Sequence, residues 1–389
     1  MFDLSKKNEF KSWRQYLHQI PELAFQENQT AEFIADKLTE FGLQVHRGLG
    51  KTGVVATLSS GNSHKKIALR ADMDGLPIQE KNSFSHKSRH ANTMHACGHD
   101  GHSAMLLAAA QYLAGHKKFN GTVYFIFQPA EEGRAGAKSM IDDGLFEKFP
   151  ADSVFGMHNF PDIPVGHFAV KSGAMMASFD CFEITLTGQA THAAMPHLGN
   201  DVIVVAAQVI NTLQTIVSRT LDPAHPAVVS ITQIHAGNTW NALPETALLR
   251  GTFRCFDAVV KTTITEKIQH LVHAVSASFG INAEIAFNPE NPGYPVTFNS
   301  EEETALALKA AIAVVGEQCV NQNPTPSMGS EDFAFMLQKK PGCYLWIGNG
   351  ASENSCLLHN PHYDFNDEIL SVGAAYWVKL VETVLKELA

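Results

Sequence analysis

The sequence predicts an α/β protein in which a mostly parallel sheet domain is interrupted by a smaller, inserted α+β domain. The chain of 389 residues is long for a single hydrophobic core, which favours two domains. Strands and helices alternate up to about residue 177 and again from about residue 292. Between these positions the order changes to βαββαβ, which is typical of a ferredoxin-like module. We therefore expect a discontinuous domain of residues 1–177 and 292–389 and an insert of residues 178–291.

The larger domain begins with two predicted helices. Apolar residues recur at helical spacing between Asn8 and Phe41, and HQIPELAFQE separates the two helices as a proline-bearing turn. Two β-rich runs follow, TGVVATLS and KKIALRADMDGLP. SAMLLAAAQYLA then predicts a helix, with His99 and Asp100 at or just before its N-terminus.

The rest of the larger domain continues this alternation. GTVYFIFQP and ADSVFGMHNF are predicted strands, and AEEGRAGAKSMIDDG between them is predicted to be one helix that ends at Gly144. After the insert we expect two helices, a strand and a C-terminal helix from about Asp367. The first three are EEETALALKAAIAVVG, GSEDFAFMLQK and GCYLWIGN.

The predicted insert consists of four strands and two helices. Its first helix, DVIVVAAQVINTLQTIV, contains three polar amides, as expected of a buried or amphipathic helix rather than a membrane span. The other elements, in chain order, are SFDCFEITLTG before that helix and then AVVSITQIHAG, ETALLRGTFRCF, TTITEKIQHLVHAVSASFG and NAEIAFNPE.

Composition narrows the classes of partner. Hydrophobic residues at 45% and charged residues at 17% describe an ordinary globular protein. The formal charge of −10 argues against a nucleic acid or an anionic membrane surface as a partner.

The N-terminal MFDLSKKNEF lacks the apolar run of a signal peptide. The six cysteines have no framework spacing, which suits a reducing compartment, so we expect a cytoplasmic protein.

Residues that can bind metals follow several predicted strands. ADMDG, HACGHD, PAEEG and GMHN do so in the first segment, and LLHNPHYDF follows GCYLWIGN. Because ligands of open α/β sheets bind beyond the carboxyl ends of the strands, these segments are expected to converge. Glu131 and Glu132 are adjacent at a strand end and therefore point in different directions, so one can bind a metal while the other faces a substrate.

The segment HACGHDGH leaves several roles open for Cys97. A catalytic thiol needs a base, which His99 could supply, but that role leaves the glutamate pair, His158 and His359 without a function. A redox disulfide favours a CxxC pair, which is absent. A thiolate with imidazoles and a carboxylate suits a transition metal such as Zn, Mn, Ni or Co, and we prefer this interpretation.

Seven motifs together resemble metallopeptidase family M20. They are HACGHDGH, LRADMDGLP, QPAEEGRAGAKSMIDDG, GMHN, THAAMPH, SMGSEDFAF and LHNPHYDFND, and they span essentially the whole chain. The resemblance is to the amidohydrolase branch of hippurate hydrolases, N-acyl-L-amino-acid amidohydrolases, auxin-conjugate hydrolases and N-acetyldiaminopimelate deacetylases. It implies a zinc-peptidase-like catalytic domain with an inserted lid or dimerisation domain, and hence a homodimer or a dimer-based oligomer.

The resemblance implies a site for two divalent transition-metal ions. Its ligands would be Cys97, His99, Glu132, His158 and His359. Glu131 would be the general base that takes a proton from water and passes it to the departing amine. Asp74 and Asp100 would orient imidazole ligands, and Asp72 stands near the position of a histidine ligand in other branches of the family.

The resemblance also assigns roles within the insert. His192 in GQATHAAMPH would stabilise the oxyanion of the tetrahedral intermediate, within its own subunit or across a dimer. Asn241 and Arg254 would hold the free carboxylate of the substrate, a task suited to a guanidinium. Without the resemblance, His192 is only a loop histidine and Arg254 a strand-end arginine.

We therefore expect a metal-dependent amidohydrolase that cleaves a hippurate-like N-acyl amino acid to a carboxylic acid and a free amino acid. The alternatives within this chemistry are a deacetylase of an N-acetyl amino acid such as N-acetyldiaminopimelate, or a dipeptidase. A thiol hydrolase using Cys97 would instead resist chelators. A catalytically silent binding protein on the same fold is the remaining alternative, and the complete residue set, including Glu131, argues against it.

Overall fold

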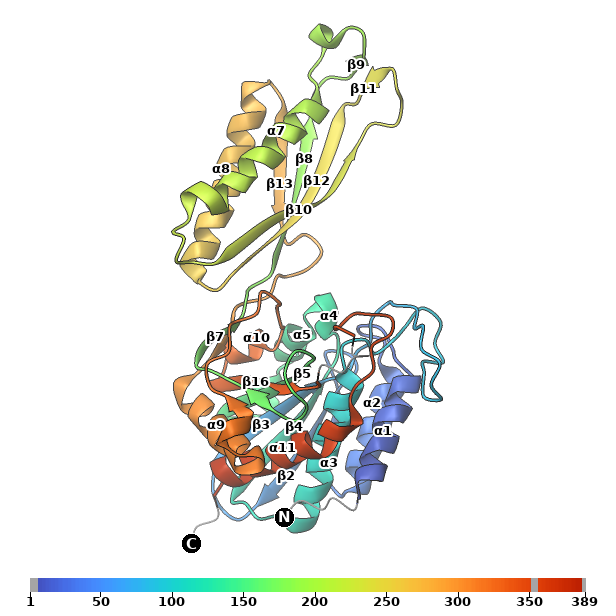
Figure 1. Cartoon of the computed structure of the whole chain (residues 1–389), viewed down its shortest axis with the longest axis vertical. Coiled ribbons are helices and arrows are strands. Elements are labelled where there is room, and N and C mark those ends of the chain that lie inside the picture. The colour runs from blue at the N-terminus through green and yellow to red at the C-terminus, as the bar shows by residue number, and fades with distance from the viewer. Residues whose placement is uncertain (1–5, 351–355, 387–389) are drawn as a thin grey trace. The chain divides into compact units, whose positions relative to one another are not determined.

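A computed structural model of the chain describes residues 6–350 and 356–386 and divides into two compact units (Figure 1). The first unit is Met1–Met175, Thr297–Thr325 and Asp332–Ala389, and the second is Met176–Val296 and Pro326–Glu331. The expected insert, residues 178–291, lies within the second unit. The ends of the expected larger domain, residues 1–5 and 387–389, lie outside the described residues.

Residues 326–331 correct the expected domain assignment. Sequence patterns predict that these residues lie in the larger domain, but they belong to the second unit, as do residues 176–177 and 292–296. The amide of Ala177 donates to the carbonyls of Ser327 and Gly329, each at 3.0 Å, and Arg254 donates to the carbonyl of Met328 at 2.8 Å. These contacts join residues far apart in sequence, which local sequence patterns do not report.

The first unit is built on an eight-stranded sheet with the order β1-β2-β4-β3-β5-β16-β6-β15. Its central strands β4, β3, β5 and β16 pair in parallel, whereas β1, β2 and β4 pair in antiparallel fashion at one edge. The sheet is therefore mostly parallel at its centre, as predicted. The strands are β1 (Gln44–Leu49), β2 (Gly53–Ser60), β3 (Lys66–Asp72), β4 (Gly121–Gln128), β5 (Ser153–Phe160), β6 (Phe168–Ala169), β15 (Val320–Asn321) and β16 (Gly342–Gly348), with β7 (Gly173–Met176) and β14 (Thr297–Asn299) in a separate ribbon.

Most predicted helices of the first unit are present, with two corrections. The helix expected over AEEGRAGAKSMIDDG is broken, because Ala130, Gly133 and Ala135 adopt left-handed backbone conformations. The helix expected over GSEDFAFMLQK is reduced to four residues. The helices are α1 (Lys7–Gln19), α2 (Asn28–Glu40), α3 (His99–His116), α4 (Glu131–Arg134), α5 (Gly136–Asp142), α6 (Leu145–Lys148), α9 (Glu301–Val315), α10 (Ala334–Leu337) and α11 (Leu370–Val384).

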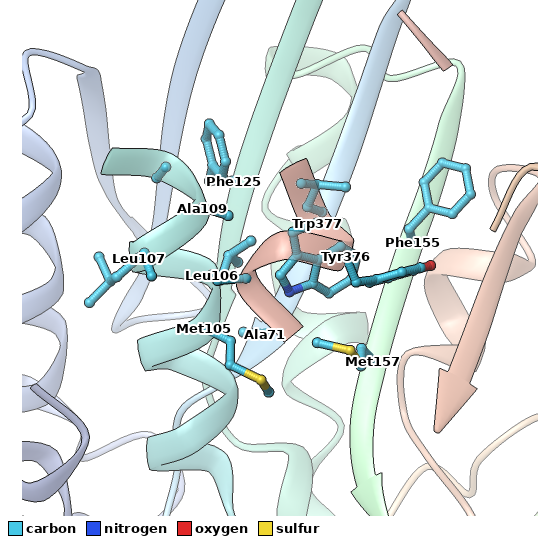
Figure 2. Packing of buried hydrophobic residues seen from close by; sticks show 14 of the residues in the cluster. Ala71, Met105, Leu106, Leu107, Ala109, Phe125, Phe155, Met157, Tyr376 and Trp377 are labelled. Carbon is cyan, nitrogen blue, oxygen red and sulfur yellow. The ribbon is translucent and has the colours of Figure 1, made fainter. Parts of the chain in front are cut away.

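The core of the first unit fixes α3 against the sheet. Figure 2 shows Met105 and Leu106 of α3 in the same cluster as Phe125 of β4, Met157 of β5 and Trp377 of α11. Each of these side chains is at most 2% exposed. Burial of one such side chain contributes roughly 1.5–3 kcal/mol. The cluster therefore holds the helix that begins at His99 in a defined position over the strands.

The second unit has the ferredoxin-like arrangement predicted for the insert (Figure 1). Its four-stranded sheet has the order β10-β12-β8-β13, and all of its pairs are antiparallel. A second ribbon pairs β9 with β11. The elements are β8 (Asp180–Thr187), β9 (Thr191–His192), α7 (Val202–Thr215), β10 (Ala227–Ala236), β11 (Ala242–Leu243), β12 (Thr246–Cys255), α8 (Ala258–Ser278) and β13 (Asn282–Phe287).

Helix α7 and its extension to Thr220 are long and apolar enough to cross a membrane by length and composition alone. Helices that pack in a protein core meet the same criterion, and one face of α7 packs in the core of the second unit. Val205, Val209 and Leu213 are at most 1% exposed and lie in the core of the second unit.

Gly101 allows the C-terminal segment to approach α3. Glycine within a helix is less stable than alanine by about 1 kcal/mol, so its presence here calls for a reason. A Cβ at this position would collide with the ring of Phe365. We expect Gly101→Ala to lower the free energy of unfolding by about 1–3 kcal/mol, the usual effect of overpacking. Chemical denaturation followed by circular dichroism measures it.

Gly115→Ala is the matched control, because Gly115 lies in the same helix and a Cβ there has no heavy atom of the described part of the chain within 4 Å. Alanine should stabilise the helix at this position by up to about 1 kcal/mol. Equal effects of the two substitutions would mean that Phe365 does not require the glycine.

Candidate metal centre

The polar clusters lie beyond the carboxyl ends of four adjacent strands. β4, β3, β5 and β16 are neighbours and run parallel, so their carboxyl ends share one edge of the sheet. The clusters therefore meet where the sequence pattern predicted. Asp72 ends β3, Glu131 and Glu132 follow β4, His158 lies near the end of β5, His99 begins α3, and His359 follows β16.

The five predicted metal ligands occupy this edge of the sheet. The Sγ of Cys97 lies 3.4 Å from Nε2 of His158. Oε1 of Glu132 lies 3.3 Å from Nε2 of His359 and 3.9 Å from Nε2 of His99. The side chain of His359 is 52% exposed, whereas the other four are largely or fully buried. Solvent therefore reaches this group of side chains at His359, and the other four side chains are largely shielded from it.

This group of donors fits a transition metal. Ligand atoms of Cys97, His99 and Glu132 all lie within 4.8 Å of one another. Nε2 of His99 is buried and has no hydrogen-bond partner among the residues that the structure describes, an unfavourable state for a polar atom. A cation between these groups would satisfy it. Thiolate, imidazole and carboxylate are ligands common to several divalent transition metals.

Negative charge dominates the surroundings of these donors. Burial, followed by the nearby carboxylates, raises the pKa of the Cys97 thiol well above its ordinary value. Burial lowers the pKa of His99, but Asp72 and Asp74 outweigh it and raise that pKa to about 10. The cluster without added positive charge therefore holds a neutral thiol and a cationic imidazole. A bound divalent cation favours the opposite state, a thiolate and a neutral imidazole.

Asp74 makes the orienting contact that the resemblance implies. Its Oδ1 lies 3.2 Å from Nδ1 of His99, and its Oδ2 accepts the backbone amide of Glu132 at 2.9 Å. The first contact leaves Nε2 of His99 directed at the cluster. The second fixes the backbone of a neighbouring ligand, so one carboxylate positions two of the candidate ligands.

His102 also belongs to this cluster, although the sequence motifs assign it no role. Its Nδ1 lies 2.6 Å from Oδ1 of Asp72, and its Nε2 accepts the amide of Asn159 at 2.9 Å. Its ring packs against that of His158, with centroids 4.4 Å apart. Residues three apart share a helix face, so the spacing from His99 was the available signal.

Asp100 does not orient a metal ligand, contrary to expectation. Its Oδ2 lies 2.8 Å from Nδ1 of the buried His18 on α1. Successive residues of an α-helix point about 100° apart, so Asp100 faces α1 while His99 faces the cluster. Burial lowers the pKa of His18, but its ion pair with Asp100 and its hydrogen bonds outweigh this and raise the pKa to about 9. The pair is therefore a buried ionic contact between α1 and α3.

A buried arginine extends this contact to the segment that follows His359. Arg14 is less than 1% exposed, and its guanidinium lies 2.7 Å from both Asp364 and Asp367 and 3.8 Å from Asp100. The amide of His359 itself donates to the carbonyl of Ala96 at 2.8 Å. Helix α1 therefore anchors two parts of the chain that carry candidate ligands.

Glu131 and Glu132 point to different neighbours, as expected for adjacent carboxylates at a strand end. Glu132 faces His359 and His99, whereas Oε1 of Glu131 accepts the amide of Asp332 at 3.4 Å. Glu131 is only 7% exposed. Glu131 is therefore a second buried carboxylate directly before the candidate ligand Glu132, a placement that suits a general base.

The predicted residues of the second unit fall in two places. His192 on β9 is exposed and pairs in register with Ala242 on β11, next to Asn241. Arg254 lies at the opposite end of β12, eight residues and roughly 26 Å along the strand from its start. Its guanidinium lies 4.8 Å from the Phe179 ring. Within this unit the structure brings His192 and Asn241 together and leaves Arg254 apart from them.

Comparison with known proteins identifies the family of this chain. The model of peptidase family M20/M25/M40 matches residues 68–383. A hippurate hydrolase of Campylobacter jejuni is 45% identical over 98% of both chains. An N-acetyl-L-cysteine deacetylase of Bacillus subtilis is 38% identical over 94% of this chain and 85% of that protein. The solved structure of the Bacillus subtilis YxeP protein, described as a dinuclear metal-binding peptidase, matches with a TM-score of 0.84 and 36% identity over 99% of this chain and 100% of that one. The chain belongs to peptidase family M20/M25/M40.

Proposed function

We propose that this protein is a metal-dependent amidohydrolase that converts N-acyl amino acids to a carboxylic acid and a free amino acid. The observation that carries the proposal is the buried group of Cys97, His99 and Glu132 with the separate carboxylate of Glu131 beside it. The names of the hippurate hydrolase and the N-acetyl-L-cysteine deacetylase support this substrate class. The higher identity to the former favours a hippurate-like substrate.

The residues of the first unit divide the chemistry between them. We propose that Cys97, His99, Glu132, His158 and His359 hold two divalent ions, with Zn, Mn, Ni and Co as candidates. When bound, such ions supply Lewis acidity, which polarises an amide carbonyl and lowers the pKa of water. Glu131 then removes a proton from the water oxygen that forms the new bond to the carbonyl carbon. It returns that proton to the nitrogen of the departing amine as the C–N bond breaks.

The roles proposed for the second unit concern the substrate. His192 would stabilise the oxyanion, and its exposed position on a short ribbon beside Asn241 is compatible with a group that meets a substrate or another subunit. Asn241 and Arg254 would bind the free carboxylate. Because they lie near opposite ends of β12, one carboxylate cannot contact both of them within a single second unit, and we favour Arg254 for this role.

We further propose that the second unit serves as a lid and dimerisation domain. Its edge strand β10 has exposed Val228 and Ile234, and the neighbouring helix α7 has exposed Ile203 and Val204. An open strand edge with apolar side chains is suited to pairing with a second copy. A cytoplasmic location is proposed from the six cysteines, all of which are free thiols.

Amino-acid release tests the proposed activity. The panel is N-benzoylglycine, several N-acetyl amino acids and a dipeptide, each with added Mn or Zn and again with a chelator. We expect chelator-sensitive release, fastest from N-benzoylglycine. Faster release from an N-acetyl amino acid or a dipeptide would favour the deacetylase or dipeptidase. Release that persists with chelator would instead make Cys97 a nucleophile, and no release in any metal-replete assay would contradict the proposal.

Glu131→Gln tests whether Glu131 acts as the general base rather than as a metal ligand. The amide cannot accept a proton at neutral pH, so the turnover number should fall by about 10²–10⁴-fold. Bound metal should be unchanged, because Glu131 is not one of the five proposed ligands and its Oε1 accepts the Asp332 amide. Elemental analysis and steady-state kinetics measure the two quantities. Glu132→Gln is the control and should lose metal, so the reverse result would exchange the two roles.

Cys97→Ser tests the thiolate ligand. A hydroxyl is a weaker ligand for transition metals than a thiolate, so metal content after dialysis should fall by about tenfold or more. Cys181→Ser, which changes a half-buried thiol of the second unit, should leave metal content unchanged. Full occupancy in the Cys97 variant by elemental analysis would remove that residue from the ligand set.

A further inference from the structure

Glu27 is a fully buried carboxylate to which the proposed mechanism gives no role. It precedes α2 in the segment HQIPELAFQE and is 0% exposed. Its Oε1 accepts the amides of Phe25 at 3.0 Å and Ala130 at 2.9 Å, and its Oε2 accepts the hydroxyl of Thr52 at 2.6 Å. Burying a carboxylate is unfavourable unless it is well hydrogen-bonded. These three hydrogen bonds therefore show which groups the buried carboxylate holds in place.

Glu27 stands at the N-cap of α2 but does not cap the helix. The amides of Gln29 and Thr30, which an N-cap side chain normally satisfies, donate instead to the carboxylate of Glu22 at 3.2 and 3.0 Å. Glu22 thus does the capping from five positions upstream. The side chain of Glu27 is directed to the turn after β4.

The turn that Glu27 reaches is the one that presents Glu131 and Glu132. Ala130 is buried and adopts a left-handed conformation with φ of 55°. For residues other than glycine this conformation is higher in energy by about 1–2 kcal/mol. Its carbonyl accepts the amide of Gly136 at 2.9 Å. The amide of Glu132 is held by Asp74. Two buried carboxylates therefore fix the backbone on either side of Glu131.

We propose that Glu27 is a positioning residue that sets the direction of Glu131 by holding the amide of Ala130 in its strained conformation. This inference rests on the proposed function, since it concerns the proposed general base. Glu27 touches neither the ligand group nor, as we infer, the substrate. Its effect passes through one backbone hydrogen bond to the residue directly before Glu131.

The chemistry of the contact indicates which substitutions preserve it. Burial, with repulsion from Asp74, raises the pKa of Glu27 to about 7, so this carboxyl is easily neutralised. The amide oxygen of glutamine can accept the same two backbone amides, and its NH₂ group can donate to Oγ1 of Thr52. Glu27→Gln should therefore keep the turn, whereas Glu27→Ala removes every one of the three contacts.

The experiment compares Glu27→Ala and Glu27→Gln with Glu22→Ala as the matched control. Glu22→Ala removes the cap of α2 and should lower the melting temperature, but the hydrogen bonds of the Glu22 carboxylate come from Gln29 and Thr30 rather than from the turn at Ala130. Each variant is assayed for kcat and KM, metal content, and hydrogen–deuterium exchange of the peptide that covers residues 129–137. The exchange measurement needs no substrate and no activity.

In Glu27→Ala we expect kcat to fall on the order of 100-fold with KM and metal content nearly unchanged, since small misplacements of a catalytic group have effects of this size. Exchange at residues 129–137 should be faster. Glu27→Gln should retain kcat within about tenfold, and Glu22→Ala should retain both kcat and the wild-type exchange.

Three results would overturn the inference. They are an unchanged kcat in Glu27→Ala, an equal loss of kcat in Glu22→Ala, or unchanged exchange at residues 129–137. If the wild-type protein released no amino acid from any substrate, the proposed function would fail instead. The exchange measurement would then still decide whether Glu27 holds the turn.

Discussion

The structure of the site depends on the carboxylate of Asp74, which binds His99 with one oxygen and the backbone of Glu132 with the other. These two partners come from different strand-end segments, one after β3 and the other after β4. A single carboxylate thereby sets the relative position of two candidate ligands, an imidazole and a carboxylate. Parallel strands bring the segments to one edge of the sheet, but only a contact of this kind fixes side-chain directions within it.

Buried charge around the site is arranged in pairs rather than left isolated. Asp72 is hydrogen-bonded by Arg70 at 2.8 Å and by His102 at 2.6 Å, and His18 lies between Asp100 and Glu80. A buried ion is tolerated when it is paired and hydrogen-bonded. These pairs allow a dense group of carboxylates beside hydrophobic packing, and such a group attracts a divalent cation.

Sequence patterns predicted the elements that depend on hydrophobic periodicity. The helices α1, α2 and α3, the parallel strands and the βαββαβ order of the second unit all follow from it. Hydrophobic periodicity did not predict the break in the helix after Pro129, because Ala130 and Glu132 are good helix formers. Their backbone conformations depend on hydrogen bonds to Glu27 and Asp74. The partner of Asp100 was missed for a similar reason, since it lies on a helix about 80 residues earlier in the chain.

The discontinuity of the first unit has a consequence for the order in which the chain folds. β16 lies between β5 and β6, and His359 comes later still, so the sheet and the ligand group draw on both ends of the sequence. The second unit is almost continuous and contains its whole four-stranded sheet between Asp180 and Phe287. During synthesis from the N-terminus, that unit can close while the first still lacks a central strand. The set of candidate metal ligands is therefore complete only after His359 has left the ribosome.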